Sequence, residues 1–143
     1  MKNLTAILAI LAITTVPGCS KGPADPDLSV TAFTYLALSG DGVQILTGSL
    51  LLSVSDSDSI SGYWNIERTD GSDHGIEVGP QIGHGQLVGT LDENDLYIDL
   101  NPDWADANVL LQGTWSGKRI TGTWTYHSFT GSTASGRFTL TPR

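Results

Sequence analysis

The sequence predicts an all-β fold, an eight-stranded antiparallel up-and-down β-barrel that follows an N-terminal export signal. Three observations support this prediction: apolar and polar residues alternate along successive segments, a glycine motif recurs on the apolar face, and short turn sequences separate the segments. Charged residues make up only 15% of the chain, whereas Gly, Ser, Thr and β-branched residues are frequent, as is typical of β-rich extracytoplasmic domains. No segment after residue 27 has helical periodicity.

The N-terminal segment has the layout of an export signal. Lys2 precedes the uncharged stretch Leu4–Val16, and Gly18 stands directly before Cys19, the only cysteine of the chain. A basic start, an apolar centre and a small residue at the cleavage point are the marks of a secretory signal. The apolar stretch is about 13 residues long, which is shorter than the ~20 residues of a membrane-spanning helix. We therefore expect residues 1–18 to be removed.

The cleavage point resembles the lipobox of bacterial lipoproteins. The residues Val16-Pro17-Gly18-Cys19 carry the resemblance, although Pro17 occupies a position that usually holds Ala, Ser, Thr or Ile. In that family the cysteine is lipidated and becomes the mature N-terminus. The resemblance covers residues 1–19 and implies that acyl chains on Cys19, such as palmitate, anchor the protein in a membrane of the cell envelope. In a bacterium with two membranes, the outer membrane is the expected location.

The mature chain is expected to be one acidic domain on a tether. Removing residues 1–18 from the 143 leaves 125, of which 19–27 form the tether and 28–143 the barrel domain. The eight residues 20–27 include two prolines and span at most about 28 Å. Removal of Lys2 leaves 6 of the 7 basic residues, which together with the 15 acidic residues give the mature chain a net charge of −9. This negative charge argues against nucleic acid as a partner. With Cys19 lipidated, no disulfide forms within the chain.

A glycine motif organises the predicted strands. An apolar residue, any residue, Gly, a small or polar residue and a large apolar residue recur at Leu46–Leu50, Ile60–Trp64, Leu87–Leu91, Leu111–Trp115, Ile120–Trp124 and, more loosely, Ala134–Phe138. Residues two apart share one face of a strand, so each glycine lies on the apolar face. An inward glycine leaves room for a large side chain of the neighbouring strand and allows the sheet to coil. The three tryptophans of the motif are therefore expected to fill the space that neighbouring glycines leave.

The strands are predicted at about 28–38, 43–55, 59–69, 85–91, 95–100, 107–116, 119–127 and 133–141. Turn sequences rich in Gly, Asp, Asn and Ser separate most of them, which predicts sequential hairpins. Eight strands in such a meander close into a barrel, which removes the exposed edges of an open sheet. A two-sheet sandwich is the alternative, but its longer crossovers are not evident.

The predicted architecture resembles the small lipocalin-like and avidin-like barrels. The resemblance depends on strand number, domain length and the Gly-x-Trp pattern that ends at Trp64, Trp115 and Trp124. It covers most of residues 28–141 and implies the fold alone. The polar residues with which avidins bind biotin have no match here.

Two functions follow from this architecture. In the first, the barrel interior binds a small apolar ligand through Trp64, Trp115, Trp124, Tyr126 and Phe138. In the second, side chains fill the barrel, and its surface serves as a protein–protein interaction or inhibitor module in the cell envelope. Candidate contact residues for the second are aromatic residues that we expect to point outward: Phe33, Tyr35, Tyr63 and Tyr97. A cavity above roughly 300 Å³ that opens at one end would favour the first function.

The loops contain two weak metal-binding patterns. The long connection 69–85 holds Asp73, His74, Glu77 and His84, but their spacing matches no known ligand motif. This connection could also cover a barrel mouth as a lid. The segment 99–106 alternates Asp and Asn residues as a calcium loop begins, yet its sixth position is Trp104 rather than Gly. We therefore predict no metal and no cofactor. Trp104 either plugs a barrel end, which we expect, or presents a hot spot for binding.

Catalytic residues are not predicted. The chain has no Gly-x-Ser-x-Gly motif, and its carboxylates cluster in turns rather than on the inward strand faces. The interpretation is a non-enzymatic protein.

Overall fold

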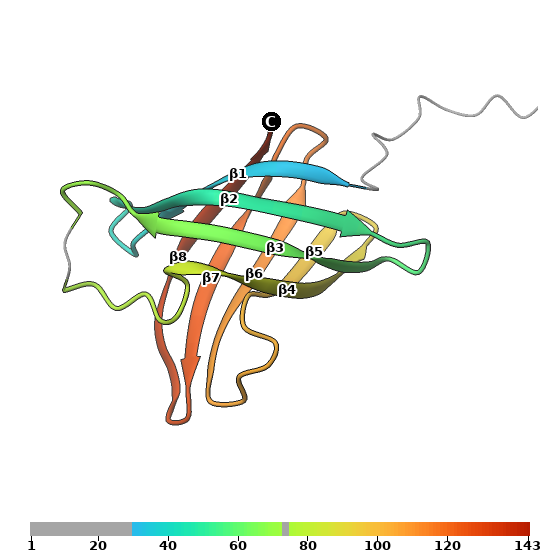
Figure 1. Cartoon of the computed structure of the whole chain (residues 1–143). Coiled ribbons are helices and arrows are strands. Elements are labelled where there is room, and N and C mark those ends of the chain that lie inside the picture. The colour runs from blue at the N-terminus through green and yellow to red at the C-terminus, as the bar shows by residue number, and fades with distance from the viewer. Residues whose placement is uncertain (1–29, 73–74) are drawn as a thin grey trace, which may run out of the picture.

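The computed structural model describes residues 30–72 and 75–143 and shows a closed barrel of eight antiparallel strands (Figure 1). The predicted signal, Cys19 and the tether lie outside the described residues, as do Asp73 and His74. The strands are β1 (Thr31–Leu38), β2 (Gln44–Val54), β3 (Ser59–Arg68), β4 (Gly83–Asp92), β5 (Asp95–Asp99), β6 (Ala107–Trp115), β7 (Ile120–Ser128) and β8 (Gly131–Pro142).

Each strand pairs with the strands before and after it, and β8 pairs with β1 to close the barrel. The up-and-down barrel predicted from the hairpin turns is thereby confirmed, and the sandwich alternative is excluded. In the part of the chain that the structure describes, there is no helix long and apolar enough to cross a membrane.

Successive strands run in opposite directions, so the connections between them lie alternately at the two ends of the barrel. At the proximal end β1 begins, β8 finishes, and the connections 55–58, 93–94 and 116–119 join the strands. At the distal end lie the connections 39–43, 69–82, 100–106 and 129–130. In Figure 1 the distal connections project to the left and bottom, away from the β2–β3 turn on the right. Val30, the first described residue, belongs to the proximal end.

The inward faces of β3, β6 and β7 are those expected from the alternation. Ile60, Trp64, Val109, Leu111 and Trp124 are all buried. The faces of β1 were assigned wrongly, because Phe33 and Tyr35, expected outside, are at most 1% exposed. Alternation is weak in this strand, since leucines lie on one face and aromatic rings on the other. Turning the larger rings inward removes more apolar surface from water.

Two tryptophans pack directly against glycines of the neighbouring strand. Trp64 on β3 lies opposite Gly85 on β4, and Trp124 on β7 lies opposite Gly136 on β8. A Cβ atom at Gly85 would lie 2.9 Å from three indole atoms of Trp64, and one at Gly136 would lie 2.6 Å from Nε1 of Trp124. The expectation that tryptophans occupy space next to glycines is therefore confirmed, with a specific partner for each of these two rings.

The long connection 69–82 closes the distal end of the barrel. Its residues Val78 and Gln81 are at most 3% exposed. The hydroxyl of Tyr35 donates to Oε1 of Gln81 at 2.9 Å, and Nε2 of Gln81 donates to the carbonyl of Val78 at 2.7 Å. The buried amide thus has partners on both of its polar atoms, as a barrel interior requires. Trp104, expected to plug a barrel end, is instead 60% exposed, so that prediction was wrong.

Candidate functional site

Side chains fill the interior of the barrel. Phe33 and Trp115 meet edge to face with ring centroids 6.3 Å apart, and Tyr35 stacks on Phe138 at 6.2 Å. The cavity beside Phe33 and Trp115, near the proximal end, measures about 10 Å³. That volume is at the lower limit for one water molecule and far below the ~300 Å³ of a small-ligand pocket.

The interior aromatic residues predicted to bind a ligand do not converge on one site. Trp64, Trp124 and Phe138 are at most 4% exposed, and Trp115 and Tyr126 are half-buried. Trp115 lies toward the proximal end, whereas the ring of Tyr126 packs on Gly79 in the connection that closes the distal end. These five side chains are spread along the core and pack against different strands.

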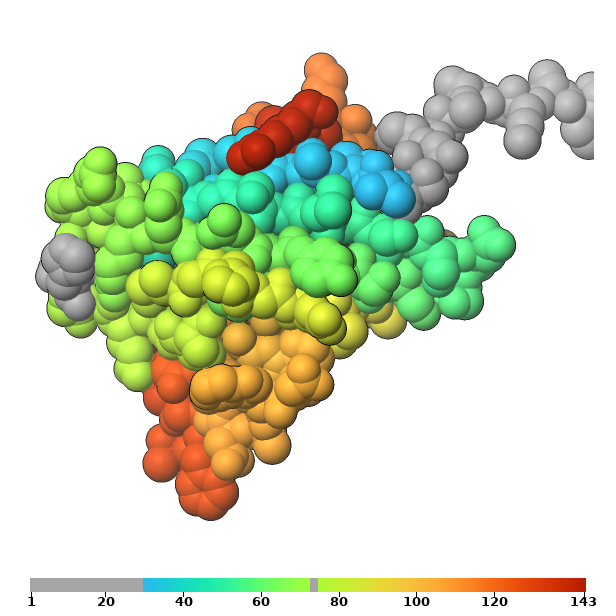
Figure 2. Space-filling view, viewed as in Figure 1, coloured from blue at the N-terminus to red at the C-terminus, as the bar shows by residue number. Residues whose placement is uncertain are grey.

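A surface hollow instead lies on the side of the barrel, where β4 and β5 separate. β5 pairs only with Val88–Asp92, so the first half of β4, from Gly83 to Leu87, pairs with β3 alone. The chain after Asp99 leaves the sheet as the connection 100–106. Between them is a cleft of about 500 Å³. Figure 2 shows this face, on which the yellow-green start of β4 borders the orange connection.

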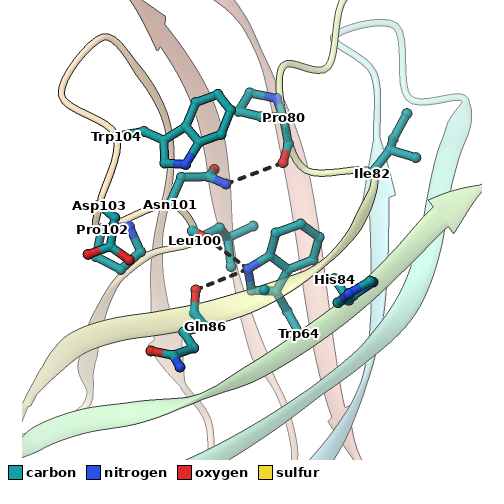
Figure 3. A pocket seen from close by; sticks show the side chains of 11 residues that line it. Trp64, Pro80, Ile82, His84, Gln86, Leu100, Asn101, Pro102, Asp103 and Trp104 are labelled. Carbon is teal, nitrogen blue, oxygen red and sulfur yellow. Dashed lines mark hydrogen bonds between the residues drawn. The ribbon is translucent and has the colours of Figure 1, made fainter.

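Trp64 forms the floor of this cleft. Its indole passes over Gly85, and Nε1 donates to the carbonyl of Leu100 at 2.7 Å and to the carbonyl of Gln86 at 3.2 Å (Figure 3). One buried side chain therefore joins the unpaired half of β4 to the connection that leaves β5. The floor is consequently rigid, and the carbonyl of Gln86 at the strand edge already has a donor.

The walls of the cleft combine an exposed indole with hydrogen-bonding groups. The lining residues are Trp64, Pro80, Ile82, His84, Gly85, Gln86, Leu100, Asn101, Pro102, Asp103 and Trp104. His84, Gln86, Asp103 and Trp104 are exposed. In Figure 3 the Trp104 ring lies above Asn101 and beside Pro80, while His84 and Ile82 lie on the opposite side. No lysine or arginine lines the cleft.

Asn101 is held in place yet has an unused acceptor. Its Nδ2 donates to the carbonyl of Pro80 at 3.3 Å, and its backbone N–H donates to Oδ1 of Asp99 at 2.8 Å. Its Oδ1 is buried and has no hydrogen-bond partner in the described structure. A buried acceptor without a donor costs about 1–3 kcal/mol, which makes it a position where a donor from outside would be stabilised.

Asp99 closes the neck of the 100–106 connection. Besides accepting from Asn101, its carboxylate accepts from Nδ2 of Asn108 at 3.2 Å. Desolvation raises the pKa of Asp99, and the hydrogen bond from the Asn101 backbone opposes that rise. Two of the residues considered as the start of a calcium loop, Asp99 and Asn101, thus bond to each other and form a turn. Among residues 30–72 and 75–143, no group of three or more His, Cys, Asp or Glu side chains is arranged to hold a metal ion.

Each distal connection also carries one exposed large apolar residue. Val43, Ile82, Trp104 and Phe129 are 56%, 46%, 60% and 86% exposed, respectively, and we call these four residues the distal rim. The described parts of the distal connections contain the acidic residues Asp41, Asp70, Glu77, Asp103 and Asp106 and no lysine or arginine. The proximal connections carry no exposed large apolar residue in the described structure.

Sequence reasoning singled out Trp104 but missed the cleft and the other three residues of the distal rim. Ile82 and Phe129 give no signal in the sequence, because a single apolar residue in a loop is common. Only their position at the same end of the closed barrel distinguishes them. Of the outward aromatic residues expected to contact a partner, Tyr63 and Tyr97 are indeed exposed, at 60% and 38%.

No protein-family model matches this chain, and no curated protein matches it in sequence.

Proposed function

We propose that this protein is a lipid-anchored binding module of the cell envelope, with a filled barrel that presents its distal rim to a protein partner. The observation that carries the proposal is the distribution of apolar surface: the interior cavity measures about 10 Å³, whereas each of the four distal connections exposes one large apolar residue. Apolar side chains that a folded domain leaves in water are the usual anchors of protein interfaces.

The proposed lipid anchor and the distal rim belong to opposite ends of the barrel. Val30, the first described residue, lies at the proximal end, opposite the rim, so the chain that leads to Cys19 joins the barrel at that end. A membrane at the proximal end leaves the distal connections facing away from it. The anchor is tested by mass: the native protein is expected to carry a diacylglyceryl adduct that Cys19→Ser abolishes. An unmodified native protein would contradict this part of the proposal.

The charge of the distal end indicates what kind of partner it takes. The described parts of the distal connections hold five acidic side chains and no lysine or arginine, and the only arginines that the described contacts bring to them are Arg68 and Arg137 of the adjoining strands. A complementary protein surface has an apolar centre and basic residues around it. Raising the salt from about 0.1 M to about 1 M shortens the screening length from ~10 Å to ~3 Å, and it should weaken such a complex.

Site-directed photo-crosslinking in native membranes tests the partner. A photoreactive amino acid at Val43 or Phe129 is expected to give one adduct of defined mass, and high salt is expected to reduce its yield. The matched control is Ser57, which is exposed in a proximal connection. Equal crosslinking at Ser57, or none at either rim position, would contradict the proposal.

The alternative, a small apolar ligand inside the barrel, predicts a different result. A ligand held among Trp64, Trp115, Trp124, Tyr126 and Phe138 should remain bound during purification and quench tryptophan fluorescence. The filled barrel predicts that native mass spectrometry finds the protein without such a ligand. A stoichiometric apolar compound in the purified protein would restore the ligand-carrier function.

A further inference from the structure

We propose that the cleft between β4 and the 100–106 connection is a binding site for a short neutral glycan of pyranose rings. This inference does not rest on the protein partner proposed above: Ile82 and Trp104 belong to both surfaces, whereas Val43 and Phe129, which test the partner, do not line the cleft. It depends on the size of the cleft, on its fixed floor, and on the chemistry of its walls.

The size of the cleft suits a ligand of a few rings. Its volume of about 500 Å³ falls within the range of ~300–1,000 Å³ that is usual for small-molecule sites. The floor does not need to be ordered by a ligand, because Trp64 already joins Gln86 and Leu100 through its indole N–H. Binding therefore does not have to organise this part of the site.

An added peptide strand is disfavoured at this edge of β4. Such a strand would need the free backbone groups of Gly83–Leu87. The carbonyl of Gln86, however, already accepts from Trp64. The connection 100–106 also occupies the side on which β5 would continue, and Leu100 is fully buried there. The cleft thus offers side chains rather than a backbone ladder.

The charges of the walls exclude anionic ligands. Asp103 is the only carboxylate of the lining, and no lysine or arginine is present. A phosphate or carboxylate would meet a negative charge without a lysine or arginine to pair with it. An entirely apolar ligand is equally unsuited, because it would cover the exposed side chains of Gln86 and Asp103 without offering them a hydrogen bond.

A pyranose ring can contact both the exposed indole of Trp104 and the polar side chains of the lining. One face of a gluco-configured ring presents C–H groups, which the negative face of an indole attracts, and Trp104 is 60% exposed. The ring edge presents hydroxyl groups that donate and accept. Asp103 accepts such hydroxyls, and Gln86 both donates and accepts. Asn101, which also lines the cleft, adds a buried acceptor, Oδ1, that has no donor in the described structure.

The test is titration of the full-length lipidated protein in detergent micelles with cellotriose and chitotriose, followed by calorimetry and tryptophan fluorescence. We expect binding of at least one of them with a Kd between about 10 μM and about 1 mM, the weak range typical of a small exposed site. Trp104→Ala should weaken it at least about tenfold, the effect of losing one aromatic contact. Asp103→Asn should weaken it by a smaller factor, since one acceptor of several is altered.

Phe129→Ala is the matched control, because Phe129 is also an exposed distal aromatic residue but does not line the cleft. Its affinity should equal that of the wild type. Near-ultraviolet circular dichroism of the buried tryptophans reports whether each variant is folded. The proposal would be overturned by absence of binding to both glycans, by binding that Trp104→Ala leaves unchanged, or by equal losses in Trp104→Ala and Phe129→Ala. Binding of octanoate or of an extended peptide at the same residues in place of glycans would also overturn it.

Discussion

Replacement of Gly85 by alanine tests whether the Trp64–Gly85 pair holds the side of the barrel together. The added Cβ would lie 2.9 Å from Cε2, Cζ2 and Nε1 of the indole, closer than such atoms approach. Overpacking of this kind costs about 1–3 kcal/mol. Displacement of the ring also weakens the three-centre hydrogen bond that its single N–H donates to the carbonyls of Leu100 and Gln86, which contributes about 1 kcal/mol. Alanine regains about 0.4–1 kcal/mol by restricting the unfolded chain.

The free energy of unfolding is therefore expected to fall by about 1–4 kcal/mol, measured by urea denaturation with fluorescence and circular dichroism. Gly40→Ala is the matched control, because no atom lies within 4 Å of a Cβ at that position. It should be neutral or slightly stabilising. In a Trp64→Phe background, Gly85→Ala should lose most of its effect, since the atoms that clash are absent. A Gly85→Ala variant within about 0.5 kcal/mol of Gly40→Ala would refute the reasoning.

Three further predictions concern buried polar groups. Burial raises the pKa of Tyr35 above its usual 10.0, so the folded state keeps the proton that the unfolded state loses, and stability should decline as pH rises above 10.0. Tyr35→Phe should reduce this decline in urea denaturation at alkaline pH. At neutral pH the same variant should lose about 1–3 kcal/mol of stability, because Oε1 of Gln81 loses its donor. Desolvation raises the pKa of Asp99 above 3.8, so its contribution to stability should decline as pH rises through that raised pKa, and Asp99→Asn should remove this component from the pH profile of unfolding; an unchanged profile would contradict the shift. Trp124→Phe should destabilise by about 3 kcal/mol or less, because Leu38 loses the indole donor at 2.9 Å, and a variant as stable as the wild type would show that this bond contributes nothing.

Much of the barrel follows from local pattern. The glycine motif places Gly62 and Trp64 on the same face of β3, and Gly122 and Trp124 on the same face of β7, because side chains alternate along a strand. Turn residues divide the chain at the observed connections to within a few positions. β1 is the exception: its leucines and aromatic residues compete for the inside, and pattern alone assigned Tyr35 to the wrong face.

The candidate sites could not be predicted in the same way. The cleft exists because β5 is shorter than β4, which leaves Gly83–Leu87 without a second partner, and strand pairing is a property of two segments rather than one. The exposure of Trp104 could not be decided from the sequence for a related reason. Whether a loop residue plugs a barrel depends on which connection occupies the opening, and here the longer 69–82 connection buries Val78 and Gln81 there.

Local sequence is enough to specify a meander of eight strands with the glycines and tryptophans of the repeated motif on its inner face, because alternation and turn chemistry act over a few residues. It also carries the lipobox-like segment around Cys19, which predicts a membrane anchor from local composition alone. Only the tertiary structure decided that the interior is filled, that Trp64 and Trp124 each pack on a glycine of the next strand, and that one apolar residue is exposed on each distal connection. Those features depend on which side chains meet when the sheet closes, and closure brings together β1 and β8 from the two ends of the domain.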